Sequence, residues 1–191
     1  MAGTLNVLSI CGSLRKGSFN AIVERSLPGL APEGMSVTKA APFRNFPLYD
    51  FDIQHEHGIP GDVVAMGKAI LAADGVIIVS PEYNFTLPVG LKNAIDWLSR
   101  MKEPSPFNGK PFAIQSAATG SLGGSRMQYH LRQVLGGLGA FVLAGPEIFI
   151  GQAKTKVNEE TRELTDETTR EFIRKQLVAF AALIERVRPQ R

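Results

Sequence analysis

The sequence predicts a single α/β domain in which helices cover both faces of a five-stranded parallel sheet. Short apolar segments rich in β-branched residues alternate with segments whose apolar residues recur at helical spacing. This alternation is typical of strands joined by right-handed helical crossovers. The length of 191 residues suits one domain and is short for two. We therefore expect a three-layer, doubly wound domain that occupies residues 1–191.

Five segments have the composition of strands. The run from Val76 to Val79 is β-branched throughout, as expected for a strand buried on both faces of a parallel sheet. The segment that starts at Met35 carries the weakest signal. In chain order the predicted strands are Leu5–Ile10, Met35–Lys39, Val76–Val79, Phe112–Gln115 and Phe141–Leu143.

Five helices are expected between and after these strands. A helix around His130 is one of them, and the histidine is interpreted as a packing residue. The other four are predicted from apolar residues that share one helical face. These faces are Phe19, Ile22, Val23, Leu27 and Leu30; Val63, Met66, Ile70 and Leu71; Leu91, Ala94, Ile95, Leu98 and Met101; and Ile173, Leu177, Phe180, Ile184 and Val187.

Two polar segments lie outside these elements. Residues 151–162 are expected to form a surface excursion. The segment from Asp50 to His57 holds three acidic residues and two histidines. Histidines two positions apart in a loop lack the rigid element that a tetrahedral metal site needs. We therefore predict a solvated, charged loop here and no metal site.

Composition excludes several classes of protein. Twenty-one basic and 18 acidic residues give a net charge of +3, and no dense basic stripe supports nucleic-acid binding. No apolar run has the length of a membrane span, and the first residues lack the pattern of a secretory signal. The single cysteine, Cys11, rules out an intramolecular disulfide and is interpreted as a small, buried hydrophobic residue. We expect a soluble, cytoplasmic protein.

The loop after the first strand has the character of a phosphate site. Residues 11–20 read CGSLRKGSFN and lead directly into a predicted helix, whose first amides favour an anion. Gly17 is followed by Ser18 and not by lysine, so the Walker A pattern fails, and the GxGxxG pattern is absent. The loop suits one terminal phosphate. The alternative is a plain strand-to-helix turn capped by Ser18.

Two further loops have the character of a ring-binding site. Residues 80–85 read SPEYNF after the third strand, and Pro81 and Pro88 hold this loop extended. Its backbone can contact the edge of a flat heterocycle. Residues 115–126 follow the fourth strand and carry mostly small side chains, so a planar ligand can lie on their backbone. The alternatives are a proline-braced connection and a flexible glycine loop. Because the three loops follow strands one, three and four, each loop strengthens the interpretation of the other two as parts of one ligand site.

These motifs resemble the NADPH-dependent FMN reductase family. The resemblance rests on Gly12-Ser13-Leu14-Arg15 with Ser18 and Asn20, on Pro81-Glu82-Tyr83-Asn84, and on Gly123-Gly124. It is greatest to the bacterial chromate/quinone reductase branch and extends over nearly the whole chain, including Leu91–Arg100 and Gln128–Gln133. It implies a flavodoxin-like fold with strand order 2-1-3-4-5, bound FMN, and a homodimer or homotetramer.

The resemblance also implies roles for individual residues. It assigns the FMN phosphate to the first loop, the isoalloxazine ring and ribityl chain to the second, and a place beside the ring to the third. Phe85 stands where many relatives have tyrosine, which removes a hydroxyl at that position. The implied cofactor-binding residues are Ser13, Arg15, Ser18, Phe19, Asn20, Pro81, Glu82, Tyr83, Asn84, Phe85, Ser116, Ala117, Thr119 and Gly120.

The predicted function is therefore NAD(P)H oxidation coupled, through FMN, to reduction of quinones or oxyanions such as chromate. NADH or NADPH is expected as co-substrate, with ping-pong kinetics. No catalytic side chain is expected, since the flavin carries the chemistry. Arg100, with Lys102 beside it, is a candidate substrate contact; the alternative is a cation that simply stabilises a helix C-terminus.

A subunit contact is a further expectation from the resemblance. It places Arg126, Tyr129 and Glu147 near such a contact, and a local salt bridge is the alternative. Three other functions are weighed against the predicted one. A flavodoxin-like electron carrier is disfavoured because such carriers are strongly acidic. An NAD(P)H-dependent FMN or azo-type reductase and a flavin-free scaffold remain as alternatives.

Overall fold

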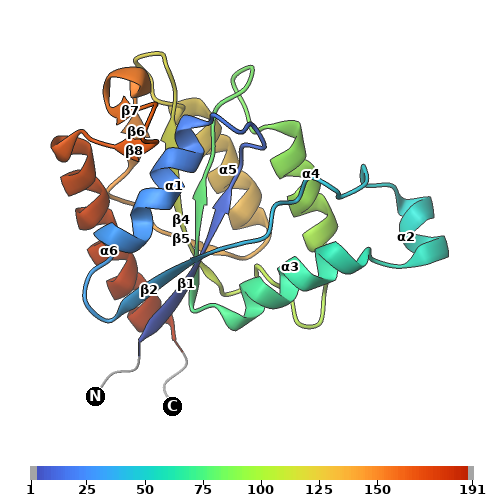
Figure 1. Cartoon of the computed structure of the whole chain (residues 1–191). Coiled ribbons are helices and arrows are strands. Elements are labelled where there is room, and N and C mark those ends of the chain that lie inside the picture. Colours follow the sequence, from blue (N-terminus) through green and yellow to red (C-terminus); the bar gives the residue numbers. More distant parts are fainter. Residues whose placement is uncertain (1–3, 189–191) are drawn as a thin grey trace.

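A computed structural model describes residues 4–188. Its main sheet is parallel and has the strand order β2-β1-β3-β4-β5 (Figure 1), which confirms the predicted fold class. The strands of this path are β1 (Leu5–Cys11), β2 (Met35–Lys39), β3 (Gly75–Val79), β4 (Pro111–Ala117) and β5 (Phe141–Val142).

Helices cover both faces of the sheet, as the alternating pattern predicts (Figure 1). One face carries α1 and α6, and the other carries α3, α4 and α5. The helices are α1 (Phe19–Leu30), α2 (Phe51–His57), α3 (Gly61–Ala72), α4 (Val89–Leu98), α5 (Ser125–Gly137) and α6 (Glu167–Val187).

Strand β3 shows why the sheet needs both layers. Val76 and Ile78 pack with α3, α4 and α5, whereas Ile77 and Val79 pack with α1 and α6. All four side chains are essentially inaccessible to solvent. Burial of a large aliphatic side chain contributes about 1.5–3 kcal/mol. The unbroken β-branched run is therefore the sequence signature of a central strand.

The fifth strand differs from its prediction. It is only two residues long, and a separate strand, β6 (Ile148–Ile150), pairs with the other half of β4. Pro146 lies in the connection between β5 and β6 and has no amide to donate to a ladder. This edge of the sheet is thus completed by two short strands, and the main sheet has six strands instead of the predicted five.

Residues 151–162 hold more structure than the predicted surface excursion. A 3₁₀ turn, η1 (Ala153–Thr155), leads to an antiparallel hairpin of β7 (Val157–Asn158) and β8 (Glu163–Leu164). Leu164 and Ala153 are buried in the same apolar cluster as α1. The hairpin lies beside α1 (Figure 1).

The predicted charged loop from Asp50 to His57 contains the short helix α2, so the prediction of a loop was wrong. Asp50 accepts a hydrogen bond from the amide of Asp52 at 2.8 Å and caps the helix. No residue of α2 is buried. A helix without an apolar face gives no periodic signal, which is why the pattern did not reveal it. Among residues 4–188, no three His, Cys, Asp or Glu side chains gather as metal ligands would.

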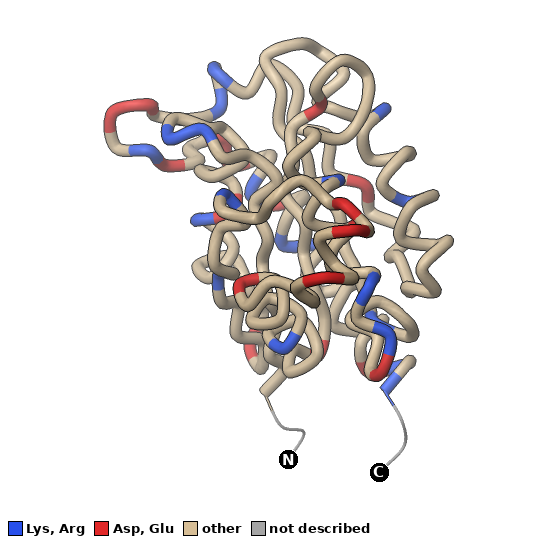
Figure 2. The backbone as a smooth tube through the Cα atoms, turned by 90° about the vertical axis from the view of Figure 1, so that its right-hand side faces the viewer, with Lys and Arg blue, Asp and Glu red and all other residues tan. Residues whose placement is uncertain are grey.

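Charged residues are dispersed over the fold. Figure 2 shows Lys and Arg interspersed with Asp and Glu along the chain. None of the helices in the described part of the chain combines the length and hydrophobicity needed to cross a bilayer.

Asp166 caps α6 and provides a test of fold stability. Its carboxylate accepts hydrogen bonds from the amide of Thr169 at 2.8 Å and from the Thr169 hydroxyl at 2.5 Å, and these bonds lower the pKa of Asp166. We expect Asp166→Ala to lower the free energy of unfolding by about 1 kcal/mol, measured by urea denaturation at pH 7.

Asp166→Asn is the matched control, because its amide oxygen can still accept from Thr169. It should unfold close to wild type at pH 7. The lowered pKa means that the charged carboxylate stabilises the native state above about pH 4, and that this contribution disappears as the pH falls further. The stability advantage of wild type over Asp166→Ala should therefore shrink in acid, whereas the advantage of Asp166→Asn over Asp166→Ala should not. Equal stability of all three proteins at pH 7 would contradict the capping role.

Candidate functional site

Three loops meet at one edge of the sheet because their strands are neighbours. In the ladders, Cys11 of β1 lies opposite Val79 of β3, and Val79 lies opposite Gln115 of β4. The segments that follow these residues therefore leave the sheet side by side. β2 and β3 flank β1 on opposite sides, so this edge includes the switch point where α/β sheets bind ligands. The structure thus brings the three sequence-predicted loops together.

Asn20 joins the first and third loops. Its amide nitrogen donates to the carbonyl oxygen of Ala117 at 2.9 Å, and its amide oxygen accepts from the amide of Ala117 at 2.9 Å. Both residues are buried. The side chain of Asn20 is therefore fully engaged within the protein. Any contact of Asn20 with a phosphate would come from its backbone amide.

The start of α1 offers groups that fit a phosphate. Ser18 occupies the N-cap position with extended backbone angles, but its hydroxyl makes no capping bond. The amides of the first helical turn have no intrahelical acceptor. Ser13 is buried nearby and accepts from the amide of Arg15 at 3.4 Å. The guanidinium of Arg15 lies 5.9 Å from the ring centre of Phe19. This cluster matches the first predicted loop.

The second loop forms a tight two-residue turn. Tyr83 and Thr86 exchange backbone hydrogen bonds of 3.1 Å, and the residues between them, Asn84 and Phe85, have φ angles of +48° and +70°. Asparagine tolerates this left-handed region, whereas a bulky residue such as phenylalanine pays about 1–2 kcal/mol there. The turn presents Tyr83 and Phe85 outward, with 48% and 64% of their surfaces exposed. Pro81, by contrast, is buried behind it.

Arg126 holds this turn from α5. Its Nε donates to Oε1 of Glu82 at 2.7 Å, and its guanidinium lies 3.9 Å from the ring centre of Phe85. The other carboxylate oxygen of Glu82 accepts from the amide of Met127 at 3.3 Å. The Glu82 carboxylate is thus engaged at the start of α5. Glu82 therefore contributes to the second loop by fixing the backbone of that loop.

The predicted set of Arg126, Tyr129 and Glu147 is divided in this chain. Tyr129 donates to Glu147 at 3.3 Å, but Arg126 pairs with Glu82. Arg132 is the arginine beside Glu147, at 3.5 Å. The local ion pairs are therefore Arg126 with Glu82 and Arg132 with Glu147.

The third loop corrects one sequence expectation. Strand β4 continues to Ala117, two residues beyond its predicted end, so Ser116 lies within the sheet with 0% of its surface exposed. Its hydroxyl donates to the carbonyl of Gly123 at 2.6 Å and accepts from Gln128 at 2.7 Å. Ser116 is therefore not beside a surface where a ring could lie.

Glycines close the third loop tightly. Gly123 and Gly124 have φ angles of +60° and +86°, and a Cβ on Gly123 would lie 2.6 Å from the backbone of Phe149. Thr119 and Gly120 are exposed at the top of the loop. They are the members of the predicted set that a ligand can reach here.

Gln128 and Arg44 are supporting residues that the sequence analysis did not identify. Gln128 is buried and also donates to the carbonyl of Ile148 at 2.8 Å. Arg44 donates to the carbonyl of Leu14 in the first loop. A glutamine on the buried face of an amphipathic helix is a usable signal, because such residues are usually exposed. Nothing in the local sequence around Arg44 indicates its contact.

Arg100 does not join the three loops within this chain. Helix α4 starts beside the second loop and runs away from it, and Arg100 lies two residues past its end. Ten helical residues span about 15 Å. The guanidinium donates to the carbonyl of Asp96 at 3.1 Å and lies 5.1 Å from the ring centre of Tyr49. This geometry matches the alternative of a cation at a helix C-terminus.

Cys11 is not an activated nucleophile. Burial raises the pKa of its thiol to about 11, so almost none is thiolate near neutral pH. Its sulfur lies 3.5 Å from the carbonyl oxygen of Ser13. The Cys11 side chain therefore contacts the first loop and is not ionised near neutral pH.

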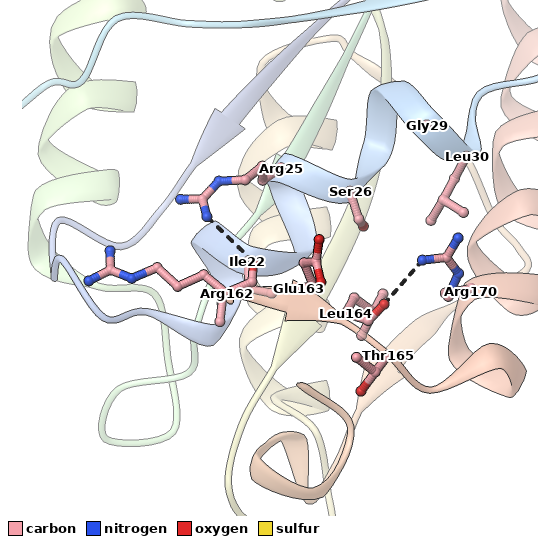
Figure 3. A pocket seen from close by; sticks show the side chains of 10 residues that line it. All are labelled: Ile22, Arg25, Ser26, Gly29, Leu30, Arg162, Glu163, Leu164, Thr165 and Arg170. Carbon is pink, nitrogen blue, oxygen red and sulfur yellow. Dashed lines mark hydrogen bonds between the residues drawn. The ribbon is translucent and has the colours of Figure 1, made fainter. Parts of the chain in front are cut away.

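A cavity of about 460 Å³ lies away from the three loops, between α1 and the β7–β8 hairpin. Figure 3 shows Arg25, Arg162 and Arg170 around it. Arg25 and Arg170 donate to the carbonyl oxygens of Arg162 and Leu164 at 3.4 and 3.2 Å. Arg162 also donates to the carbonyl of Lys16 at 3.3 Å, so the hairpin braces the first loop. The cavity contains no residue of the predicted flavin site.

Comparison with known proteins agrees with the arrangement of the loops. Residues 5–155 match the family model described as NADPH-dependent FMN reductase. A quinone reductase from Escherichia coli K12 is 48% identical over 188 residues, which cover 98% of this chain and 100% of that protein. An NAD(P)H-dependent FMN reductase from Pseudomonas aeruginosa is 42% identical, with the same coverage of both chains.

Solved structures show the same architecture. A flavoenzyme NAD(P)H:(acceptor) oxidoreductase from Paracoccus denitrificans superposes with a TM-score of 0.83 at 30% identity, covering 96% of this chain and 98% of that one. A flavodoxin from Pseudomonas aeruginosa has a TM-score of 0.58 at 14% identity, covering 93% and 99%. The second likeness concerns the fold alone.

The Asn20–Ala117 pair yields a prediction about both stability and ligand binding. Asn20→Ala leaves the buried amide and carbonyl of Ala117 without partners, which costs about 1–3 kcal/mol for a buried group. We expect a loss of stability in that range by urea denaturation. We also expect about a tenfold weaker Kd for FMN by fluorescence quenching, since 1.4 kcal/mol corresponds to tenfold.

Asn45→Ala is the matched control because Asn45 is exposed. It should change neither quantity. Wild-type stability and FMN affinity in Asn20→Ala would contradict the role of Asn20 in joining the loops.

Proposed function

This chain belongs to the NADPH-dependent FMN reductase family, and we propose that it reduces quinones at the meeting point of its three loops, with NADH or NADPH as electron donor. One observation carries this proposal: neighbouring parallel strands bring a phosphate-type loop and two ring-type loops to the same sheet edge. The relative named quinone reductase, which aligns along its whole length, supports the choice of acceptor.

The residues around this edge fit FMN. The Ser18 hydroxyl and the first amides of α1 would hold the phosphate, with Ser13 and Arg15 beside them. The backbone of residues 81–84 and the exposed tip at Thr119 and Gly120 would hold the ring. The chemistry that FMN supplies when bound is the transfer of two electrons from a nicotinamide to an acceptor.

The protein's own part is to orient the bound flavin and acceptor and to shield them from water. The pair of Arg126 and Glu82 fixes the second loop, so the backbone amides of that loop keep their direction without reorganising. Tyr83 and Phe85 offer exposed aromatic surface for a flat acceptor. No side chain near the loops has to act as a nucleophile, and the raised pKa of Cys11 is consistent with this. Ping-pong kinetics follow if donor and acceptor use the same open site in turn.

Three finer points belong to the same proposal. An oxyanion such as chromate is a second acceptor that the cations of the first loop would attract. Assembly into a homodimer or homotetramer is supported by large exposed apolar side chains, which include Leu48, Phe51 and Val89. The site is expected to work in the cytoplasm, where reduced nicotinamide nucleotides are made.

The first test is a direct assay of the flavin. Purified protein loaded with FMN should lose its flavin absorbance on addition of NADH or NADPH without oxygen, and benzoquinone should restore it. Initial rates at several fixed quinone concentrations should give parallel double-reciprocal lines. A flavin that NAD(P)H does not reduce, or that quinone does not reoxidise, would disprove the proposal. Free FMN as a better acceptor than quinone would favour the alternative of an FMN reductase.

The second test concerns the contact between Arg126 and Glu82, which holds the second loop. Arg126→Ala leaves the Glu82 carboxylate, whose side chain is 9% exposed, without its guanidinium. We expect the KM for benzoquinone to rise and the affinity for FMN to fall, each by about three- to tenfold, equivalent to about 0.7–1.4 kcal/mol. Arg126→Lys should restore part of the loss, because a lysine keeps the charge but not the two-pronged geometry.

Arg100→Ala is the matched arginine variant. From its position past α4, we expect its KM values for nucleotide and quinone to stay within about twofold of wild type. A larger rise in KM would indicate that Arg100 contacts the substrate, at the site of a second subunit. If Arg126→Ala had the same KM for benzoquinone and the same affinity for FMN as wild type, the role of Arg126 in holding the second loop would be refuted.

A further inference from the structure

A second pocket lies on the other side of the first loop, towards β2. It has a volume of about 250 Å³ and is bounded by the end of β1, residues 13–16, one side of α1 and residues 39–44. Five of its lining residues are basic and none is acidic. The basic residues are Arg15, Lys16, Arg25, Lys39 and Arg44.

The sheet topology separates this pocket from the proposed flavin site. β2 lies on the opposite side of β1 from β3 and β4, whose loops form the ring site. The two sides of α1 divide in the same way. Asn20 is bonded to Ala117 at the end of β4, whereas Ala21 lines the pocket beside β2. The first loop is therefore shared: Ser13 and Arg15 also line this pocket, whereas Lys16, Lys39 and Arg44 line it and are not among the proposed flavin contacts.

The positive charge of the pocket is largely uncompensated. Lys39 is paired with Glu24 at 2.9 Å, and the Glu24 side chain is only 2% exposed. Within residues 4–188, Arg15, Lys16, Arg25 and Arg44 have no carboxylate within 4.0 Å. Four unpaired cations around one concavity create a field that favours a multiply charged anion.

Two of these cations are fixed in place by backbone contacts. Arg44 donates to the carbonyl of Leu14, and Arg25 donates to the carbonyl of Arg162 at 3.4 Å. Each guanidinium thus has a backbone partner, and its remaining N–H groups can still donate to an anion. An apolar floor that includes Ile10 and Phe43 keeps water away from one side. A charge-assisted hydrogen bond is stronger in such surroundings.

We propose that this pocket binds a phosphate monoester, and that its source is the 2′-phosphate of NADPH or a free phosphate ester. The inference rests on the proposed function, since it makes the pocket a specificity site for the nicotinamide donor. A phosphate monoester carries nearly two negative charges at neutral pH and so matches the surplus of cations. The pocket borders the first loop, as the proposed flavin site does, so a dinucleotide with its 2′-phosphate in the pocket would extend past that loop to the flavin.

The experiment uses FMN-loaded enzyme, in which the phosphate position at the start of α1 is already filled. Binding of 2′-AMP, with 5′-AMP for comparison, is measured by isothermal titration calorimetry. The variants are Lys16→Gln, Arg25→Gln and the double variant, and Lys68→Gln at an exposed position of α3 is the matched control. Flavin absorbance reports that each variant is folded and loaded.

We expect the double variant to bind 2′-AMP at least about tenfold more weakly than wild type, because it loses two charge-assisted hydrogen bonds. Each single variant should bind with intermediate affinity. Raised salt should weaken the wild-type binding. Lys68→Gln should bind as wild type does. Unchanged 2′-AMP binding in the double variant, or no 2′-AMP binding by wild type, would overturn the proposal.

Steady-state kinetics distinguish the two sources. A KM for NADPH that rises in the double variant, with the KM for NADH unchanged, supports the 2′-phosphate of the donor. Weakened 2′-AMP binding with both KM values unchanged supports a free phosphate ester. Failure of the proposed function itself would be seen separately, as wild-type flavin that neither nucleotide reduces.

Discussion

The reciprocal hydrogen bonds between Asn20 and Ala117 are the constraint on which the site depends. They join the first turn of α1 to the last residue of β4 across a distance of 97 residues in sequence. The phosphate-type loop and the third loop are thereby fixed relative to each other. The second loop is held to the same frame through Glu82, which reaches the start of α5. Two side chains, Asn20 on α1 and Glu82 in the second loop, thus set the geometry that a flat cofactor needs.

Sequence pattern predicted the parts of the fold that are buried on both faces. The β-branched run of β3 and the apolar faces of α1 and α6 lie where they were expected, because periodic burial leaves a periodic sequence. Helix α2 and strand β6 were missed for the opposite reason. One has no buried face, and the other is a three-residue edge beyond a proline.

The candidate site was predictable at the level of loops but not of individual contacts. Local motifs singled out three loops, and the structure brings these loops together, since parallel strands end at a common edge. They could not show that Asn20 bonds to Ala117 or that Glu82 pairs with Arg126, because these partners are far apart in sequence. Ser116 lies inside the sheet because β4 is two residues longer than its predicted run. A motif does not distinguish polar side chains that hydrogen-bond within the fold from those that face a ligand. A motif alone therefore overstates the number of ligand contacts.

The left-handed turn at Asn84 and Phe85 has a consequence for how this fold can diversify. The turn is closed by its own backbone hydrogen bonds and braced by Arg126 from behind, while the Phe85 ring points outward. The side chain at this position is therefore separated from the packing of the sheet. Substitutions there can alter the shape and polarity offered to an acceptor while the cofactor loops keep their positions. A lineage could thus change its range of oxidants through one exposed residue, without rebuilding the core.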